Sequence, residues 1–346
     1  MTPKSVMVLG LATVAAVGAA AYSLSSNPTA ISTAVSGAVF PGLIDKVNDV
    51  TKVLIDHRDK TLTISRGKDG WSMAEADGYA VAPKNAEKVV VQLADLNFYE
   101  MKTKKPELYD RLHVEDPKGE ESEGRRIRLF DAEGKVLADL VAGRKRYNLV
   151  GARKEGVYIR KPENPQTWLA AGELNVEVRP GEWLVEGIVD IGEKEIARAV
   201  VRHPDGEVVE VSKPDPEARN FTLAGIPEGK QLKYDTDPNN LAAVPDQLNL
   251  EDARKAGAIA FPDGETIQAT FETRDGLSLT IDAVSKDDST WARLKAGTMA
   301  DAKPEARKRA DEINKRVEGW VYKLPGFKAT RLTRRVADML KDKPAS

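Results

Sequence analysis

Cysteine is missing from this 346-residue sequence. Its absence excludes disulfides, thiolate metal sites and a cysteine nucleophile, although it does not fix the cellular compartment. An excess of charge of one sign is also missing, because 52 lysines and arginines oppose 54 aspartates and glutamates. A chain without an overall basic field is not expected to bind nucleic acid. The 41% hydrophobic and 31% charged residues are typical of a globular protein, and the length allows two domains.

Catalytic and nucleotide-binding motifs are missing as well. The sequence contains no P-loop, dinucleotide fingerprint, G-x-S-x-G elbow or HExxH pair. Its three histidines, His57, His113 and His203, are isolated from one another. We therefore predict no catalytic, cofactor-binding or metal-binding residue, and we expect a protein that is not an enzyme.

One long uncharged hydrophobic run is present, at residues 6–24 after Lys4. Its length is close to the roughly 20 residues that a membrane-spanning helix needs. Residues 1–24 are therefore predicted to be a signal anchor, a single span of the inner membrane with Lys4 in the cytoplasm and the body in the periplasm. The alternative is a signal peptide cleaved at Ala19-Ala20-Ala21, which would release the body into the periplasm. Residues 25–39 are predicted to be a flexible tether.

Two stretches of the chain have nearly the same pattern. Residues 50–66 and 196–213 are each a hydrophobic run, a polar turn that begins with a histidine, and a second hydrophobic run. Val53, Ile55, Leu62 and Ile64 alternate with polar residues, which predicts a β-hairpin with one buried face.

The segments that follow the two hairpins also occur in the same order. After the first we expect a strand at 71–76, a helix at 83–100, a helical turn at 106–117, a hairpin at 126–143 and a strand at 156–161. After the second we expect a strand-like segment at 220–226, a helical stretch at 238–257, a hairpin at 267–284 and a strand at 290–296. Gly134 and Gly276 occupy the matching turns.

This order predicts an α+β protein made of two tandem hairpin-and-helix units with antiparallel sheets, residues 40–178 and 179–298. The alternative is two ordinary α+β domains whose hairpins look alike. Residues 299–346 are predicted to be a mostly helical segment, with Ala310, Ile313, Val317 and Trp320 on one face and a break at Pro325-Gly326.

Several stretches in this order resemble a known bacterial family. They are FPGLIDKVNDVTKVLI at 40–55, the Gly70-Trp71 pair, ELYDRLHVEDP at 107–117 and GWVYKLPGFKATRLTRRVADML at 319–340. Together they resemble the family called domain of unknown function 4340. The resemblance implies an N-terminal hydrophobic segment and an envelope protein that works beside ABC-type transport components, including auxiliary proteins similar to those linked with gliding motility. It implies no catalytic residue.

Four other features are candidates for binding, and each also has a plain structural interpretation. Asp235, Asp237, Asn239 and Asp246 have part of the spacing of a calcium loop, but helix capping explains them as well. The basic cluster at 143–148 could contact anionic lipid or be a solvated turn. The tryptophans could stack on sugars or pack in the core. The aromatic residues at 320–327 could lock the C-terminus or contact a partner.

From these observations we expect a non-enzymatic, membrane-anchored periplasmic accessory or adaptor protein. Its expected partners are the membrane and ABC-type transporter subunits, and nucleic acid is not expected. The first alternative is a periplasmic module that binds a glycan or lipid. The second is a hydrolase with an unrecognised pair of carboxylates.

A signal anchor at residues 1–24 predicts that the mature protein keeps its first residues and fractionates with the inner membrane. Mass spectrometry of the mature N-terminus checks this. A protein that begins after Ala21 and appears in the periplasmic fraction would establish the cleaved alternative.

Overall fold

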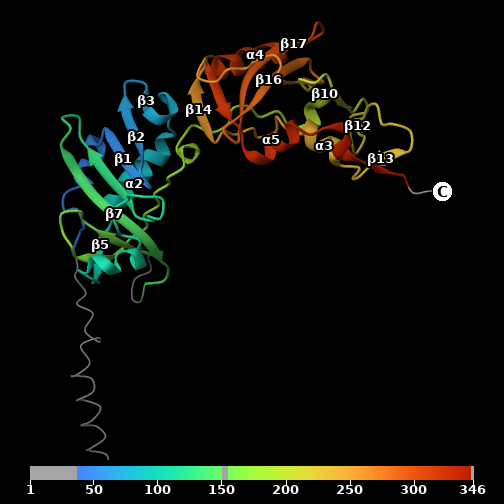
Figure 1. Ribbon diagram of the computed structural model, residues 1–346. Coiled ribbons are helices and arrows are strands. Elements are labelled where there is room, and N and C mark those ends of the chain that lie inside the picture. The colour runs from blue at the N-terminus through green and yellow to red at the C-terminus, as the bar shows by residue number, and fades with distance from the viewer. Residues whose placement is uncertain (1–36, 150–154, 344–346) are drawn as a thin grey trace, which may run out of the picture. The chain divides into compact units, whose positions relative to one another are not determined.

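The computed structural model describes residues 37–149 and 155–343 (Figure 1). Two large sheets organise these residues, and the strand pairs that are resolved residue by residue in both sheets are antiparallel. A few α-helices accompany the sheets, so the α+β class is confirmed. Short 3₁₀ helices occur in the connections, at Ile44–Asp49, Ala74–Ala76, Pro106–Leu108, Asp110–Leu112, Pro180–Glu182 and Glu193–Glu195.

The N-terminal sheet has nine strands, and the first hairpin lies beside a strand that comes much later in the chain. In spatial order the strands are β4 (Tyr79–Ala80), β3 (Gly70–Met73), β2 (Lys60–Gly67), β1 (Lys52–His57), β6 (Arg125–Phe130), β7 (Val136–Arg146), β8 (Gly156–Arg160), β9 (Thr167–Ala171) and β5 (Asn97–Met101). Val53, Ile55, Leu62 and Ile64 are buried, which confirms the predicted alternation.

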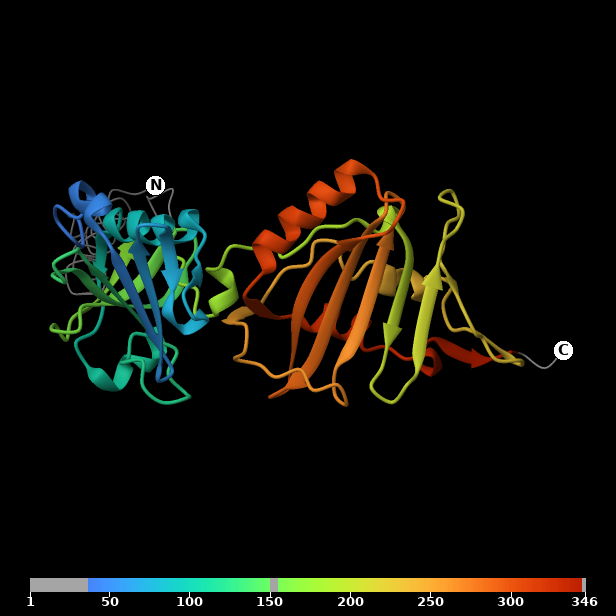
Figure 2. The ribbon, with the colours of Figure 1, turned by 90° about the horizontal axis from the view of Figure 1, so that it is seen from above.

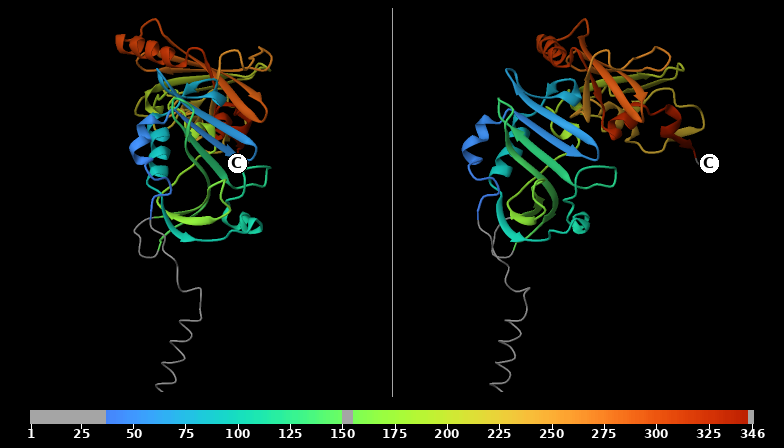
Figure 3. Two further views of the ribbon diagram at one scale, coloured as in Figure 1. Left: turned by 90° about the vertical axis from the view of Figure 1, so that its left-hand side faces the viewer. Right: turned by 60° about the vertical axis from the view of Figure 1, so that its left-hand side comes forward.

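Figure 3 shows helix α2 (Pro83–Ala94) beside strands of the N-terminal sheet. Its residues Ala86, Val89, Val90 and Leu93 are buried, as their helical spacing predicts. The helix is shorter than expected, because residues 97–101 form β5 and pair with β9. The prediction of helix up to residue 100 was therefore wrong for this segment, where aromatic side chains favour a strand.

The segment between β5 and β6 packs against the sheet face that carries Tyr158 and Leu169. Tyr109 and Val114 from this segment join Tyr158 and Leu169 in one buried cluster. The backbone passes so close to β7 that a Cβ on Gly143 would lie 2.2 Å from the carbonyl oxygen of Leu112.

The C-terminal sheet has eight strands. In spatial order they are β12 (Thr222–Leu223), β11 (Val208–Ser212), β10 (Ile196–Arg202), β15 (Ile267–Thr273), β16 (Leu277–Lys286), β17 (Ser289–Thr298), β18 (Trp320–Lys323) and β14 (Asp252–Lys255). The segment between β14 and β15 packs Ile259 and Phe261 against Trp291, Val284 and Val321.

Helix α3 (Asp237–Ala242) is the only α-helical part of the stretch predicted at 238–257. The end of that stretch forms β14, which pairs with β18. The prediction was wrong here because Asp252, Arg254 and Lys255 have no strand pattern of their own, and their pairing partner lies more than 60 residues later in the sequence.

The C-terminal segment contains α4 (Pro304–Val317), α5 (Gly326–Leu332) and α6 (Val336–Met339). Figure 2 shows α4 as the long helix beside the strands of the C-terminal sheet. The segment is less helical than predicted, because Trp320 lies in strand β18 rather than on a helix. Gly319 adopts a φ of 80°, which ends the helical path before Trp320.

Strand β19 (Leu340–Asp342) pairs with β13 (Lys230–Leu232) in a small separate sheet.

The predicted signal anchor and most of the predicted tether lie outside the described residues. Within residues 37–149 and 155–343, no helix is both long and apolar enough to cross a membrane.

The close approach at Gly143 gives a stability test. Replacing Gly143 by Ala should lower the free energy of unfolding by at least about 2 kcal/mol, because the added methyl group overlaps the backbone of the crossing segment. Denaturant unfolding of the purified body measures the change. The control is Gly297→Ala in β17, where a Cβ would meet no atom within 4 Å and the change should stay within about 0.5 kcal/mol. Equal effects of the two substitutions would show that the backbone at Leu112 does not pack closely against Gly143.

Candidate functional site

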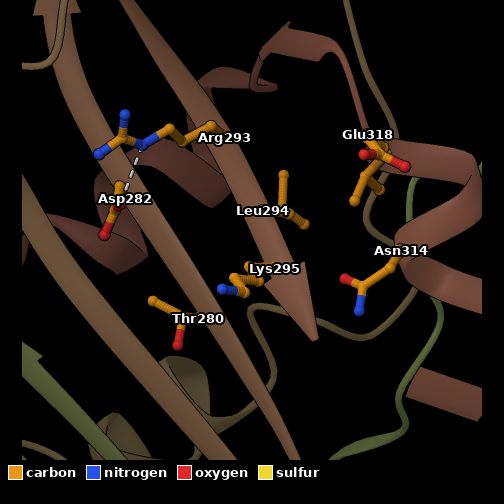
Figure 4. Close-up of a pocket in the computed structure, with 8 residues that line it drawn as sticks. Thr280, Asp282, Arg293, Leu294, Lys295, Asn314 and Glu318 are labelled. Atoms are coloured by element: carbon orange, nitrogen blue, oxygen red, sulfur yellow. Dashed lines mark hydrogen bonds and ion pairs between the residues drawn. The ribbon is translucent and has the colours of Figure 1, made fainter. Parts of the chain in front are cut away.

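A cavity lies between the outer part of β17 and helix α4. We call it the β17–α4 groove, and its volume is about 540 Å³. This size falls within the roughly 300–1,000 Å³ that is common for ligand sites. The residues that line it are Thr280, Asp282, Arg293, Leu294, Lys295, Asn314, Val317 and Glu318 (Figure 4).

Strand β17 has an incomplete partner on the side away from β16. It pairs with β16 from Ser289 to Thr298, but with β18 only at Trp291 and Ala292. At Ala296, the amide side chain of Asn314 takes the place of a neighbouring strand. The Ala296 N–H donates to Asn314 Oδ1 at 2.8 Å, and Asn314 Nδ2 donates to the Ala296 carbonyl at 2.9 Å. Asn314 thus satisfies the same two backbone groups that a neighbouring strand would satisfy.

Leu294 lies between these two partnered positions. Backbone groups of alternate residues in an antiparallel strand point to the same side. The N–H and C=O of Ala296 point away from β16, so those of Leu294 do as well. The β18 pairing stops at Ala292, and Leu294 has no strand partner on that side. The backbone N–H and C=O of Leu294 therefore face the β17–α4 groove.

The side chains on the sheet side of the groove carry charge. Arg293 lies directly opposite Asp282 and Lys295 directly opposite Thr280, so these four side chains share one face of the sheet. Arg293 Nε donates to Asp282 Oδ2 at 2.9 Å, and Gln268 donates to the other carboxylate oxygen of Asp282 at 3.3 Å. No ion pair of Lys295 is seen within the described part of the chain.

Helix α4 forms the other wall of the groove. Pro304 stands in its first turn, where its missing N–H costs nothing, and Ala306, Ala310, Ile313 and Val317 are its buried residues. Asn314 is adjacent to this apolar face, which directs its amide at β17. Glu318 follows the last helical residue and is exposed, and Figure 4 shows it on the same wall as Asn314.

This arrangement is suited to binding. It offers a backbone donor and acceptor, two apolar side chains from Leu294 and Val317, an exposed ammonium from Lys295 and an exposed carboxylate from Glu318. The carboxylate of Asp282 is already engaged by Arg293 and Gln268. A ligand that matches these groups must itself combine a backbone-like donor and acceptor with charge.

None of these groove residues was predicted from the sequence to bind a ligand, and Val317 was predicted only as part of an apolar helix face. The available signal was Asn314, a polar residue beside the apolar face of a predicted helix. Leu294 and Lys295 gave no signal, because an alternating strand looks the same whether its edge is paired or open.

The three histidines remain far apart in the chain, and none contributes to the groove. His57 ends β1, with its Nδ1 3.1 Å from the Gly124 carbonyl oxygen. His203 is buried at the turn between β10 and β11, where its backbone N–H donates to the backbone carbonyl of Glu207 at 2.9 Å. His113 ends a 3₁₀ helix in the left-handed conformation. Among the residues that the structure describes, no cluster of three or more His, Asp or Glu side chains could hold a metal ion.

The side chains of the calcium-like spacing contact different neighbours. Asp237 is buried and forms a 2.7 Å ion pair with Arg334. Asn239 Oδ1 accepts a hydrogen bond from the Phe221 N–H at 3.0 Å. The expected capping role was wrong for α3, since no side chain caps its first turn. These residues instead connect α3 to the C-terminal segment and to the residues before β12.

The other candidates from the sequence have separate positions. Trp71, Trp183 and Trp291 are buried, and no tryptophan lines the β17–α4 groove. Within the cluster at 143–148, Tyr147 is 64% exposed. In the C-terminal aromatic segment, Tyr322 and Leu324 are buried, whereas Phe327 is exposed.

Asp252 of β14 and Lys328 of α5 have pKa values shifted mainly by burial. Burial raises the pKa of Asp252, an effect opposed by the nearby guanidinium of Arg254. Burial also lowers the pKa of Lys328, whose Nζ donates to the Ala243 carbonyl at 2.9 Å and to the Asp246 carbonyl. Neither group lines the groove, and each has partners that explain a structural role.

The Asn314 bridge gives a test of the groove's construction. Replacing Asn314 by Ala should lower the free energy of unfolding by about 1–2 kcal/mol, because the N–H and C=O of Ala296 lose their partners. Hydrogen exchange of the Ala296 amide should become faster at the same time. The matched control is Lys315→Ala, the next and exposed residue of α4, which should change neither quantity. Unchanged exchange at Ala296 in the Asn314 variant would show that the bridge does not protect this edge.

Comparison with known proteins identifies a family. The family model described as domain of unknown function (DUF4340) matches residues 71–258, which is more than half of the 346-residue chain. The comparisons found no match among curated proteins and none among solved structures. The matched region begins within the N-terminal sheet and ends just after β14. The chain therefore belongs to the family described as domain of unknown function (DUF4340).

Proposed function

We propose that this chain is a non-enzymatic accessory protein of the bacterial envelope that acts by binding a partner protein. The partner that the family resemblance implies is the membrane part of an ABC-type transport system. The N-terminal hydrophobic run supports an inner-membrane anchor with the body in the periplasm, although it lies outside the described residues.

We further infer that the two units arose by tandem duplication. Eight strands of the N-terminal sheet follow the order β3-β2-β1-β6-β7-β8-β9-β5, and the C-terminal sheet follows β12-β11-β10-β15-β16-β17-β18-β14. These two orders correspond strand for strand along the sequence. In each unit, the segment after the edge strand also packs an apolar cluster against one sheet face. Independent domains that share only a common hairpin would not be expected to agree in all these respects.

The second unit departs from the first between β17 and β18. Strand β8 pairs with β9 over its whole length, from Gly156 to Arg160. The corresponding strand β17 continues to Thr298, and α4 is inserted before the chain returns as β18. The β17–α4 groove is therefore an addition to the matching part of the two sheets. The observation that carries the proposal is that β18 pairs with β17 only as far as Ala292, which leaves Leu294 without a strand partner on that side.

The alternatives make different demands on this site. A glycan-binding module would use exposed aromatic side chains, whereas the groove offers an open strand edge. A hydrolase would need two carboxyl groups directed at one substrate bond. The two acidic residues of the groove lie on opposite walls, and Asp282 is bound to Arg293. These observations favour partner binding.

Capture from intact membranes tests the proposal. A tagged full-length chain is cross-linked in cells of its source, solubilised mildly and purified, and co-purifying proteins are identified by mass spectrometry. We expect ABC-type transport subunits to be enriched over a control bait with the same N-terminal segment and an unrelated body. Recovery of no transport subunit, when known envelope complexes survive the same procedure, would contradict the proposed partner. Turnover of a substrate by the purified body at an enzyme-like rate would contradict the non-enzymatic role.

A further inference from the structure

We propose that the β17–α4 groove binds an extended polypeptide segment of the partner by strand pairing with Leu294. The segment would place an apolar residue opposite Leu294 and an acidic residue opposite Lys295. This inference rests on the proposed function and adds the chemical class of the ligand.

The backbone argument concerns the edge of β17. Leu294 presents one N–H and one C=O to the groove, and an extended peptide residue presents the complementary C=O and N–H. The paired positions on either side, Ala292 with Tyr322 and Ala296 with Asn314, limit the pairing to one residue of the incoming segment. A free anion without a hydrogen-bond donor would satisfy the N–H but would leave the carbonyl without a partner.

The side-chain argument follows from the pleat of the strand. Residues that lie opposite each other in paired strands direct their side chains to the same face. The residue opposite Leu294 therefore faces the side of Leu294, which is only 8% exposed. Val317, which is 3% exposed, lines the same groove from α4. An apolar side chain is the appropriate choice for this position.

The charge argument identifies the neighbouring residue. The residues on either side of this apolar residue direct their side chains to the face that carries Arg293 and Lys295. Arg293 is already paired with Asp282, whereas Lys295 is exposed and pairs with no acidic side chain of the described residues. An acidic residue opposite Lys295 therefore completes the pairing of charges on this face. Glu318 on the other wall disfavours a segment with more than this local negative charge.

The probe is the blocked tripeptide acetyl-Glu-Val-Glu-amide. In the antiparallel direction, the one in which a single residue exchanges both hydrogen bonds with Leu294, its valine pairs with Leu294 and its first glutamate lies opposite Lys295. We expect saturable shifts of the Leu294 amide in NMR spectra of the ¹⁵N-labelled periplasmic body, with a Kd of about 1 mM. Replacing the valine by N-methylvaline removes the N–H that donates to Leu294, and should weaken binding about fivefold. Equal binding of both peptides, or shifts that map elsewhere, would overturn the strand-pairing model.

Charge reversal tests the second part of the proposal. Lys295→Glu should weaken binding of the acidic peptide by at least about threefold and should favour acetyl-Lys-Val-Lys-amide instead. The matched control is Lys286→Glu, the same change on β16 at a residue that does not line the groove, and it should bind the acidic peptide like the natural chain. Equal effects of the two variants would overturn the assignment of Lys295.

The same Lys295 variant separates this inference from the proposed function. Used as the bait in membrane capture, it should lose transport subunits that the natural chain and the Lys286 variant retain. If it retains them fully while it fails to bind the acidic peptide, the partner docks elsewhere and the inference falls, but the proposed function stands.

Discussion

The need to satisfy backbone hydrogen bonds at the edges of a sheet governs this protein. An edge strand exposes a row of N–H and C=O groups that pair with any available strand. At the β5 edge, residues 37–39 cover the strand, because the Phe98 N–H donates to the Gly37 carbonyl and the Val39 N–H donates to the Leu96 carbonyl. At β17 a helix supplies the cover instead, through a single side-chain amide. Because one side-chain amide pairs with a single residue, Ala296, and β18 pairs only as far as Ala292, the N–H and C=O of Leu294 have no strand partner on this side.

Apolar side chains are buried on both faces of each sheet, and this burial stabilises a scaffold of short strands. The buried positions of the hairpins form one apolar face, and at one end of the other face a connecting segment adds a second cluster. The rest of that second face is polar and contains cross-strand ion pairs such as Arg126 with Asp139 and Arg198 with Glu210. Pairs of this kind, whose side chains remain partly exposed to solvent, contribute little to stability, so the apolar clusters carry most of the stabilisation.

The hairpins were predictable because their register is encoded locally. In the first hairpin Val53 and Ile55 are buried, and Arg58 and Asp59 adopt positive φ at the turn. In the later hairpin Ala269 and Phe271 alternate with polar neighbours, and Gly276 occupies the turn. Strands β14 and β18 were not predictable in the same way. Their residues continue a helical spacing, and each becomes a strand only because the other lies beside it in the fold. Gly319 was the one local sign that the helix ends before Trp320.

The groove was harder to predict than the fold, for a related reason. Whether the backbone of Leu294 is open depends on where β18 turns away and on where Asn314 enters, and both are properties of segments that follow it in the chain. A strand sequence contains the preference for pairing but not the identity of the partner. The matching strand order of the two sheets helps here, because β8 pairs with β9 over its whole length whereas β17 pairs with β18 at only two residues.

The amide of Asn314 also attaches helix α4 to strand β17. The helix and any strand that extends along β17 compete for the same N–H and C=O of Ala296. An incoming segment that pairs beyond Leu294 would first have to displace the amide, and its own backbone would then make the two hydrogen bonds to Ala296. Binding of such a segment to β17 and attachment of α4 to the sheet are then thermodynamically linked. A ligand that displaces the amide weakens the attachment of α4.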